Sequence, residues 1–200
     1  MNPRVRALLL PVAAFVLVLV VGAGGWLLLS HDTVQQVSGI GGPFTLTDGS
    51  GHAVSDRDLR GHYLLVYFGY TFCPDVCPTT LTAMAGALDK LGKQADRVTP
   101  VFITVDPERD TPKVVGAYVA AFSPRILGLT GTSQQIAAVA REYRVYYAKR
   151  RTGEGAGDYT MDHSSIIYLM APDGHFIAPV AADGTASQMA ADIARHLGAG

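Results

Sequence analysis

Residues 63–78 read YLLVYFGYTFCPDVCP, an apolar run followed by two cysteines. The near-continuous apolar character of residues 63–68 predicts a strand that is covered on both faces. From Pro78 the large apolar side chains recur every three or four residues, which predicts a helix that ends at Gly92. Cys73 and Cys77 are the only cysteines in the chain. They therefore lie where a buried strand passes into a helix.

The rest of the chain predicts further strands and helices around this unit. Strands are expected at residues 44–46 and 53–54 as a small hairpin, and at 101–105, 145–149, 165–170 and 176–180. Helices are expected at 113–122, at 133–143 with Ser133 as N-cap, and at 185–197. Residues 150–157, with three glycines, are expected to form a mobile hairpin tip or loop. This order predicts an α/β fold, a mixed sheet flanked by helices that resembles thioredoxin.

An uncharged and mostly apolar run at residues 7–29 precedes these elements. As a helix it would extend about 34 Å, enough to cross a hydrocarbon core of about 30 Å. Arg4 and Arg6 precede the run, and no Lys or Arg follows it before Arg57. Because positive charges tend to stay inside, residues 1–6 are expected in the cytoplasm and the remainder outside. A cleaved secretory signal is the alternative, although the run exceeds the usual apolar region of about 7–15 residues.

The expected organisation is thus a single-pass anchor at 7–29, a tether at 30–42 and one globular domain at 43–200. A bacterial cytoplasmic membrane, with the domain in the periplasm or on the outer face, is the predicted location. Without Arg4 and Arg6, 14 basic residues stand against 17 acidic ones. That balance argues against nucleic-acid binding. Either form of export puts the two cysteines in an oxidising compartment, where a disulfide is permitted.

The cysteine pair is compatible with both redox and metal chemistry. A cysteine at a helix start lies near the positive end of the helix dipole, which favours thiolate and lowers the thiol pKa. Thiolate is both the nucleophile and the metal ligand, so this location leaves the two chemistries open. Thioredoxin-like oxidoreductases normally carry two residues between the cysteines, whereas Pro74-Asp75-Val76 makes three. The longer loop lets both sulfurs converge on one ion without preventing a disulfide.

A histidine is the residue that would favour metal binding. The candidates are His31, His52, His62, His163, His175 and His196. His163 differs from the others because it enters a predicted buried strand, whose end faces the same crevice as the cysteine turn. A lone histidine is more often a hydrogen-bonded structural residue, since a ligand needs a converging site. The residues by themselves leave this choice open.

Four segments resemble the Sco/SenC family of copper chaperones. They are YFGYTFCPDVCP at 67–78, VDPERDTP at 105–112, GLTGT at 128–132 and DHSS at 162–165. The resemblance runs from about residue 41 to residue 169 in the expected order, with the expected membrane anchor ahead. Some family members place a histidine immediately before the first cysteine, where this chain has Phe72.

The resemblance implies copper, as Cu(I) or Cu(II), bound by Cys73, Cys77 and His163. It also implies a role in building the binuclear copper site of cytochrome c oxidase. The implied partners are the copper-bearing oxidase subunit, another copper chaperone and a thiol reductant. Two thiolates and one imidazole suit Cu(I) and can hold Cu(II), although zinc would accept the same donors.

The residues leave two other functions open. In the first, Cys73 and Cys77 are a redox pair of a thiol–disulfide oxidoreductase that reduces the copper-ligating cysteines of the oxidase subunit. In the second, the protein is a peroxidase of the peroxiredoxin type, which shares the fold but needs neither copper nor His163.

Several polar and aromatic residues have two interpretations. Asp162 either orients His163 or is a turn residue at a strand entry, and Asp75 either tunes the thiols or is solvated. Asp106, Glu108 and Asp110 form either an acidic docking edge or a turn closed by its own ion pairs. The scattered methionines and clustered tyrosines are expected in the packed interior. They are Met84, Met161, Met170, Tyr143, Tyr146 and Tyr147.

Overall fold

The structure, a computed structural model, describes residues 39–155 and 157–198. Its strands are β1 Thr45–Asp48, β2 Ala53–Ser55, β3 Tyr63–Gly69, β4 Val98–Thr104, β5 Leu127–Thr130, β6 Tyr147–Arg151, β7 Tyr159–His163, β8 Ile166–Met170 and β9 Phe176–Ala181. Its α-helices are α2 Val76–Leu91, α3 Pro112–Ala120, α4 Ser133–Glu142 and α5 Ala186–His196, with 3-10 turns η2 Asp56–Leu59 and η3 Gly92–Arg97.

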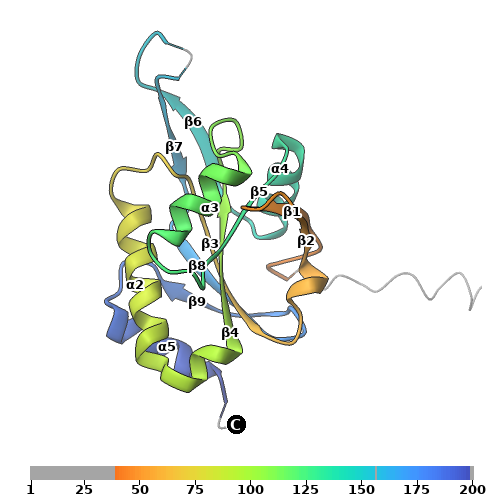
Figure 1. Cartoon of the computed structure of the whole chain (residues 1–200), viewed down its shortest axis with the longest axis vertical. Helices are drawn as coiled ribbons and strands as arrows, with labels where there is room; N and C mark the ends of the chain where they lie inside the picture. The colour runs from red at the N-terminus through yellow and green to blue at the C-terminus, as the bar shows by residue number, and fades with distance from the viewer. Residues whose placement is uncertain (1–38, 156, 199–200) are drawn as a thin grey trace, which may run out of the picture. The chain divides into compact units, whose positions relative to one another are not determined.

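Seven strands form one mixed sheet in the order β2-β1-β5-β4-β3-β8-β9 (Figure 1). Strands β3, β4 and β5 run parallel, while β8 pairs antiparallel with β3. Tyr67 and Phe102, which are partners in register, contact α2 and α3, whereas Phe68 contacts Tyr143 at the end of α4. The central strand is therefore covered on both faces. The predicted thioredoxin-like mixed sheet with flanking helices is confirmed.

The helix after the cysteines begins earlier than predicted. It starts at Val76 rather than Pro78, so Cys77 lies in its first turn. It ends at Leu91, and Gly92 follows with a φ of 54°, as the predicted stop at that glycine requires. The two-residue shift matters because it places Cys77 among the free backbone N–H groups of the helix start.

Strand β5 was not predicted as a strand. It is only four residues long, LGLT, and has a glycine where an apolar side chain would have signalled a strand. A Cβ atom at Gly128 would lie 2.7 Å from Val115 Cγ1, so only glycine lets α3 pack this closely on β5. The residue that allows the packing thus weakens the sequence signal.

The segment around His163 also differs from the prediction. We expected His163 to lead into the strand at 165–170, but it ends a strand of its own, β7, and β8 begins at Ile166. The chain turns between them because Ser164 exchanges hydrogen bonds with the backbone of Tyr146. Strands β6 and β7 form a separate two-stranded sheet.

The predicted loop at 150–157 is shorter than expected, because Arg150 and Arg151 belong to β6. They pair in register with Thr160 and Tyr159 of β7. The first of the predicted strand residues, Val145, is buried but lies outside β6. The predicted strand at 145–149 and the start of the predicted loop therefore both lie two residues too early. The sequence did not show that β7 is the pairing partner of this strand, and that pairing sets the register.

The predicted membrane span at 7–29 lies outside the described residues. Within the part of the chain that the structure describes, no helix combines the length and the apolar character needed to cross a membrane. Of the predicted tether, residues 39–42 are described, and there Ile40 packs against the core while the Gly41 N–H donates to the Glu142 carbonyl.

Helix α4 is capped one residue earlier than predicted. Thr132, not Ser133, is the N-cap, and its Oγ1 accepts a hydrogen bond from the Gln135 N–H at 3.2 Å. The Gln135 side chain returns the contact by accepting from the Thr132 N–H at 2.8 Å. Two neighbouring hydroxyl residues fit the capping preference, and only the backbone conformation distinguishes them.

Replacing the cap tests this correction. Thr132→Ala is expected to lower the free energy of unfolding by about 1 kcal/mol, because one helical N–H loses its acceptor. Ser133→Ala, the matched control, is expected to change it by less than about 0.5 kcal/mol. Urea unfolding of the full-length chain measures both. A larger loss in Ser133→Ala than in Thr132→Ala would contradict the assignment.

Candidate metal centre

The two cysteines lie on either side of the start of α2. The Cys73 N–H donates to the Tyr70 carbonyl at 3.2 Å, which closes the turn after β3. The Cys77 N–H then donates to Cys73 Sγ at 3.4 Å. Cys73 is half-buried and Cys77 is fully buried, and both are free thiols. One sulfur is therefore accessible from outside, while the other lies behind it in the interior.

Gly69 lets the Cys77 sulfur approach the end of β3. A Cβ atom on Gly69 would lie 2.8 Å from Cys77 Sγ and 2.8 Å from Cε2 of Phe102. Both distances are shorter than van der Waals contact, so a larger residue would displace the thiol or the ring. Sequence reasoning missed this role. The signal available was a glycine closing an apolar strand, which often marks a close approach.

His163 reaches the cysteines from the end of β7. Its Nε2 lies 3.5 Å from Cys77 Sγ, and its Nδ1 lies 3.1 Å from the Ser164 carbonyl oxygen. Because a carbonyl only accepts, Nδ1 is the nitrogen that carries the proton. This tautomer leaves the lone pair of Nε2 directed at the cysteine side, as a metal ligand requires.

The aromatic rings of Tyr67 and Tyr70 fix the orientation of the imidazole. Both contact His163 edge to face, with centroid separations of 6.3 Å and 5.9 Å. The Tyr67 hydroxyl also donates toward Cys77 Sγ at 3.7 Å. The two tyrosines thus confine the histidine between the end of β3 and the cysteine turn.

The donor atoms of Cys73, Cys77 and His163 all lie within 4.8 Å of one another. Ligands bound at about 2.0–2.3 Å to one ion stand roughly 3.3–4.0 Å apart, so small side-chain shifts would place all three around one ion. Within residues 39–155 and 157–198, no other group of three or more His, Cys, Asp and Glu side chains converges in this way. The structure therefore brings together the three residues that the sequence singled out.

The two thiols differ strongly in acidity. The Cys77 thiol donates to Cys73, and this contact, with backbone N–H groups, holds the pKa of Cys73 at about 3 although burial of the sulfur opposes the shift. The pKa of Cys77 is raised because its proton is held by Cys73 and because the sulfur is buried. The lowered pKa expected for a cysteine at the helix start thus applies to Cys73 only.

The turn between β4 and α3 supports the cysteine segment from behind. Asp110 is fully buried, and its carboxylate accepts hydrogen bonds from the Thr71 N–H at 3.0 Å and from the Thr71 and Thr104 hydroxyls at 2.5 Å each. Burial raises the pKa of Asp110 even though these donors oppose the shift. Thr71 lies two residues before Cys73, so the position of the turn depends on this network.

The acidic residues of that turn do not form a docking edge. Asp106 is buried and pairs with Arg109 at 2.5 Å, while the exposed Glu108 pairs with Lys149 at 2.8 Å. The alternative interpretation, a turn closed by its own ion pairs, describes Asp106 with Arg109, whereas Asp110 bonds to Thr71 and Thr104 instead. The sequence did not indicate that this turn holds the cysteine segment.

Two predicted roles near the ligands are not seen. Asp162 forms an ion pair with Arg150 at 2.6 Å across the hairpin, whereas the partner of the His163 Nδ1 is the Ser164 carbonyl. Asp162 is also not a strand-entry residue, since it lies within β7. Asp75 is exposed at the N-cap of α2 and makes no side-chain capping bond. Neither carboxylate belongs to the site.

The methionines and most of the tyrosines are packed as predicted. Met84, Met161 and Met170 are buried, Tyr143 is buried, and Tyr147 is half-buried against the core. Tyr146 was expected to pack around the sheet, but it is 58% exposed. Its backbone is held by Ser164, which turns its side chain out of the core.

The remaining histidines lie away from the cysteines. His52 and His175 are exposed in the turns after β1 and β8, where each neighbours an aspartate. His62 is exposed before β3, and His196 ends α5. His31 lies outside the described residues.

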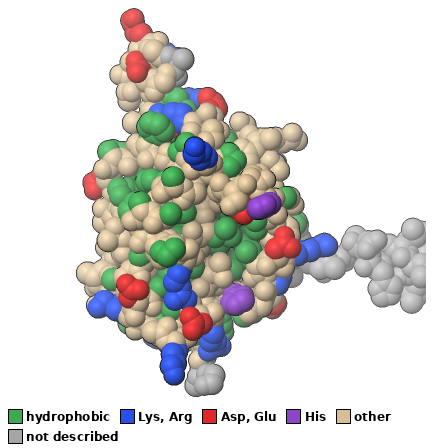
Figure 2. All heavy atoms as spheres, viewed as in Figure 1, with side chains coloured by type: hydrophobic (Ala, Val, Ile, Leu, Met, Phe, Trp, Pro, Cys, Tyr) green, Lys and Arg blue, Asp and Glu red, His purple; other side chains and the backbone are tan. Residues whose placement is uncertain are grey.

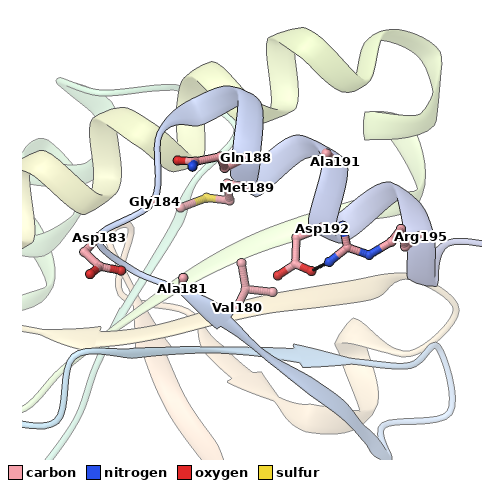
Figure 3. Close-up of a pocket in the computed structure, with 9 residues that line it drawn as sticks. All are labelled: Val180, Ala181, Asp183, Gly184, Gln188, Met189, Ala191, Asp192 and Arg195. Carbon is pink, nitrogen blue, oxygen red and sulfur yellow. Dashed lines mark hydrogen bonds and ion pairs between the residues drawn. The ribbon is translucent and has the colours of Figure 1, made fainter.

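A hollow between β9 and α5 holds none of the three donors (Figure 3). Its volume is about 520 Å³, and it is lined by Val180, Ala181, Asp183, Gly184, Gln188, Met189, Ala191, Asp192 and Arg195. Asp192 and Arg195 face each other within it as an ion pair. A second hollow beside it includes Val76 and Ser165, next to the cysteine and histidine segments.

Comparison with known proteins assigns the family. The model of the SCO1/SenC family matches residues 32–198. This chain belongs to the SCO1/SenC family. It is 44% identical over 160 residues to the human protein named SCO1 homolog, mitochondrial, covering 79% of this chain and 53% of that protein. It is 45% identical over 160 residues to SenC of Rhodobacter capsulatus, covering 80% and 72%.

Solved structures of relatives share the fold. The structure of Bradyrhizobium japonicum ScoI with copper bound has 50% identity and a TM-score of 0.72, covering 78% of this chain and 98% of that one. Arabidopsis thaliana ScoI with copper bound has 42% identity and a TM-score of 0.74, covering 79% and 98%. The chain spans about half the length of the first curated relatives, 53% of the human and 56% of the mouse protein.

The acidity difference predicts selective alkylation. At about pH 6 the medium lies above the lowered pKa of Cys73 and below the raised pKa of Cys77, so only Cys73 is thiolate, the reactive form. Brief iodoacetamide treatment of the reduced, metal-free, full-length chain is therefore expected to label Cys73. Peptide mass spectrometry measures this. Cys77→Ser, whose hydroxyl can still donate to Cys73, is the control and should keep fast labelling; equal labelling of both cysteines would contradict the assignment.

Proposed function

We propose that this protein is a copper metallochaperone that binds one copper ion through Cys73, Cys77 and His163. The observation that carries the proposal is the convergence of two sulfurs and one imidazole nitrogen within 4.8 Å. Relatives of 50% and 42% identity have been solved with copper bound, which supports copper as the ion. The expected role is to support assembly of the binuclear copper site of cytochrome c oxidase.

The donor set suits an ion that is carried and released. Two thiolates and one imidazole are soft to borderline donors, which favour Cu(I) and can also hold Cu(II). Three protein ligands leave a position at which a partner's ligand can attack. Cys77 is buried while Cys73 is half-buried, so a partner would approach from the Cys73 side. Zinc would accept the same donors, and the copper-bound relatives are what favours copper.

The surface beside the site is apolar enough to receive a protein partner. Phe72 is 59% exposed and Val76 is 47% exposed, one on each side of the cysteine turn, and Ile166 at the start of β8 is 39% exposed. Hydrophobic side chains gather on the upper left of the face in Figure 2, over the segment joining β3 to α2. Exposed apolar groups around a functional site are typical of a docking surface. The proposed partners are the copper-bearing oxidase subunit, a copper-donating chaperone and a thiol reductant.

Copper titration tests the ligand set. The full-length chain in reductant is expected to bind one Cu(I), and His163→Ala is expected to weaken binding at least as much as loss of a group that orients a ligand, about 10-fold or more, because one of three ligands is lost. Cys73→Ser and Cys77→Ser should weaken it further. His62→Ala removes an exposed histidine at the other end of β3 and should have no effect. Stoichiometric binding that survives His163→Ala and Cys77→Ser unchanged would refute the site.

A second candidate function is a thiol–disulfide oxidoreductase that reduces the oxidase subunit. It is favoured by the asymmetry of the pair, because a half-buried Cys73 of low pKa is suited to attack and a buried Cys77 to resolve the mixed disulfide. Complementation separates the two functions. A cell lacking this protein should regain oxidase activity with His163→Ala only if the oxidoreductase function is the correct one, whereas Cys73→Ser should fail in both cases.

We further propose that residues 7–29 anchor the protein in a bacterial cytoplasmic membrane as a single pass, with residues 43–200 in the periplasm or on the outer face. The long apolar run after Arg4 and Arg6 supports this. The anchored chain is expected to stay in the membrane fraction after alkaline extraction, with its N-terminal residues intact by mass spectrometry. Release of a shortened chain would instead identify a cleaved signal.

A further inference from the structure

Arg109 lies between the cysteine segment and the hairpin that carries His163. Its guanidinium carbon is 3.7 Å from the ring centroid of Tyr159, the first residue of β7. On the other side it lies 4.6 Å from the ring of Phe72 and 5.9 Å from that of Tyr70. Phe72 immediately precedes Cys73. One cation thus contacts aromatic rings from both parts of the chain that supply donor atoms.

Polar contacts hold Arg109 and Tyr159 together. The Arg109 Nε donates to the buried carboxylate of Asp106 at 2.5 Å, and Nη1 donates to the Tyr159 carbonyl at 3.1 Å. The other oxygen of Asp106 accepts from the Tyr159 hydroxyl at 2.9 Å. Tyr159 is therefore held through its ring face, its carbonyl and its hydroxyl. Nη2 is buried and has no hydrogen-bond partner among the described residues.

The β6–β7 hairpin depends on such contacts for its placement. It forms a sheet of its own, and no ladder joins it to the seven-stranded sheet in the described residues. Figure 1 shows β6 and β7 running side by side toward the tip at the top of the view. His163 is four residues beyond Tyr159 on β7. On the His163 side the chain continues into β8, which pairs with β3, and the rings of Tyr67 and Tyr70 contact the imidazole. At the other end of β7, side-chain contacts at Tyr159 are what join the hairpin to the segment before the cysteines.

We propose that Arg109 is a positioning residue for the metal centre. Through Phe72 and Tyr70 on one side and Tyr159 on the other, it couples the Cys73 segment to the hairpin and keeps the His163 Nε2 within ligand reach of the Cys77 sulfur. The hydrogen bonds and ring contacts of Arg109 within the described residues are made to Asp106, Tyr159, Phe72 and Tyr70, so it acts through these residues and not as a ligand. The inference rests on the proposed function, because it concerns the same three ligands.

A double-mutant cycle in the full-length chain tests the coupling. Arg109→Gln is expected to weaken Cu(I) binding about 10- to 100-fold when His163 is present, as loss of a group that orients a ligand does. In the His163→Ala background the same change is expected to cost less than about threefold, because there is no histidine left to position. A loss of equal size in both backgrounds, or no loss with His163 present, would overturn the proposal.

Two further variants separate positioning from general damage. Arg97→Gln removes an arginine that lies 5.6 Å from the ring of Tyr63, at the opposite end of β3, and is expected to leave copper affinity unchanged. Phe72→Ala removes only the exposed ring on the cysteine side. It should weaken binding about two- to fivefold, again only with His163 present. Unchanged affinity in Phe72→Ala would show that the cysteine side of the coupling does not exist.

A measurement without metal distinguishes this inference from the proposed function. In the metal-free protein, amide hydrogen exchange of residues 157–163 is expected to be faster in Arg109→Gln than in wild type and Arg97→Gln. If copper affinity proves independent of His163, the proposed ligand set fails, and the exchange measurement still decides the role of Arg109. Unchanged exchange in residues 157–163 would overturn that role whatever the copper result.

Discussion

The approach of the His163 Nε2 to the Cys77 sulfur, 3.5 Å apart, is the contact on which the proposed chemistry depends. It joins the end of a two-stranded hairpin to the first turn of a helix, and within the described residues that hairpin shares no ladder with the seven-stranded sheet. Gly69 makes the contact sterically feasible from the side of the sheet, because any Cβ there would collide with Cys77 Sγ. The Ser164 carbonyl selects the ring nitrogen that carries the proton, which leaves Nε2 free to act as a donor.

Buried charge supports this contact from behind. Asp106 and Asp110 lie in the turn after β4 and are buried, which is costly for carboxylates unless they are well hydrogen-bonded. Asp110 is satisfied by Thr71 and Thr104, and Asp106 by Arg109 and Tyr159. One turn therefore holds the cysteine segment with one carboxylate and the histidine hairpin with the other. The acidic turn after β4, which the sequence suggests is an exposed charged surface, therefore supports the site from inside the protein.

The sequence predicted β3 and α2 because the apolar pattern of each lies within its own residues. The apolar run of β3 and the periodicity of α2 need no information from elsewhere in the chain. The predictions were wrong where packing or pairing with another segment of the chain sets the structure. Strand β5 depends on α3 fitting over Gly128, and the β6–β7 hairpin depends on a register that neither strand shows alone. Asp162 was assigned to His163 by adjacency in sequence, but alternation along β7 points it to Arg150 instead.

The sequence alone determined the fold class, the place of Cys73 and Cys77 at a strand-to-helix junction, and the family resemblance that singled out His163. These follow from residue types and short spacings, which are local properties. Only the tertiary structure decided that Cys73 is the acidic, accessible thiol and Cys77 the buried one, and that Arg109 stands between the two halves of the site. Burial, acidity and contacts between distant segments depend on distances in space, and His163 lies 86 residues from Cys77 along the chain.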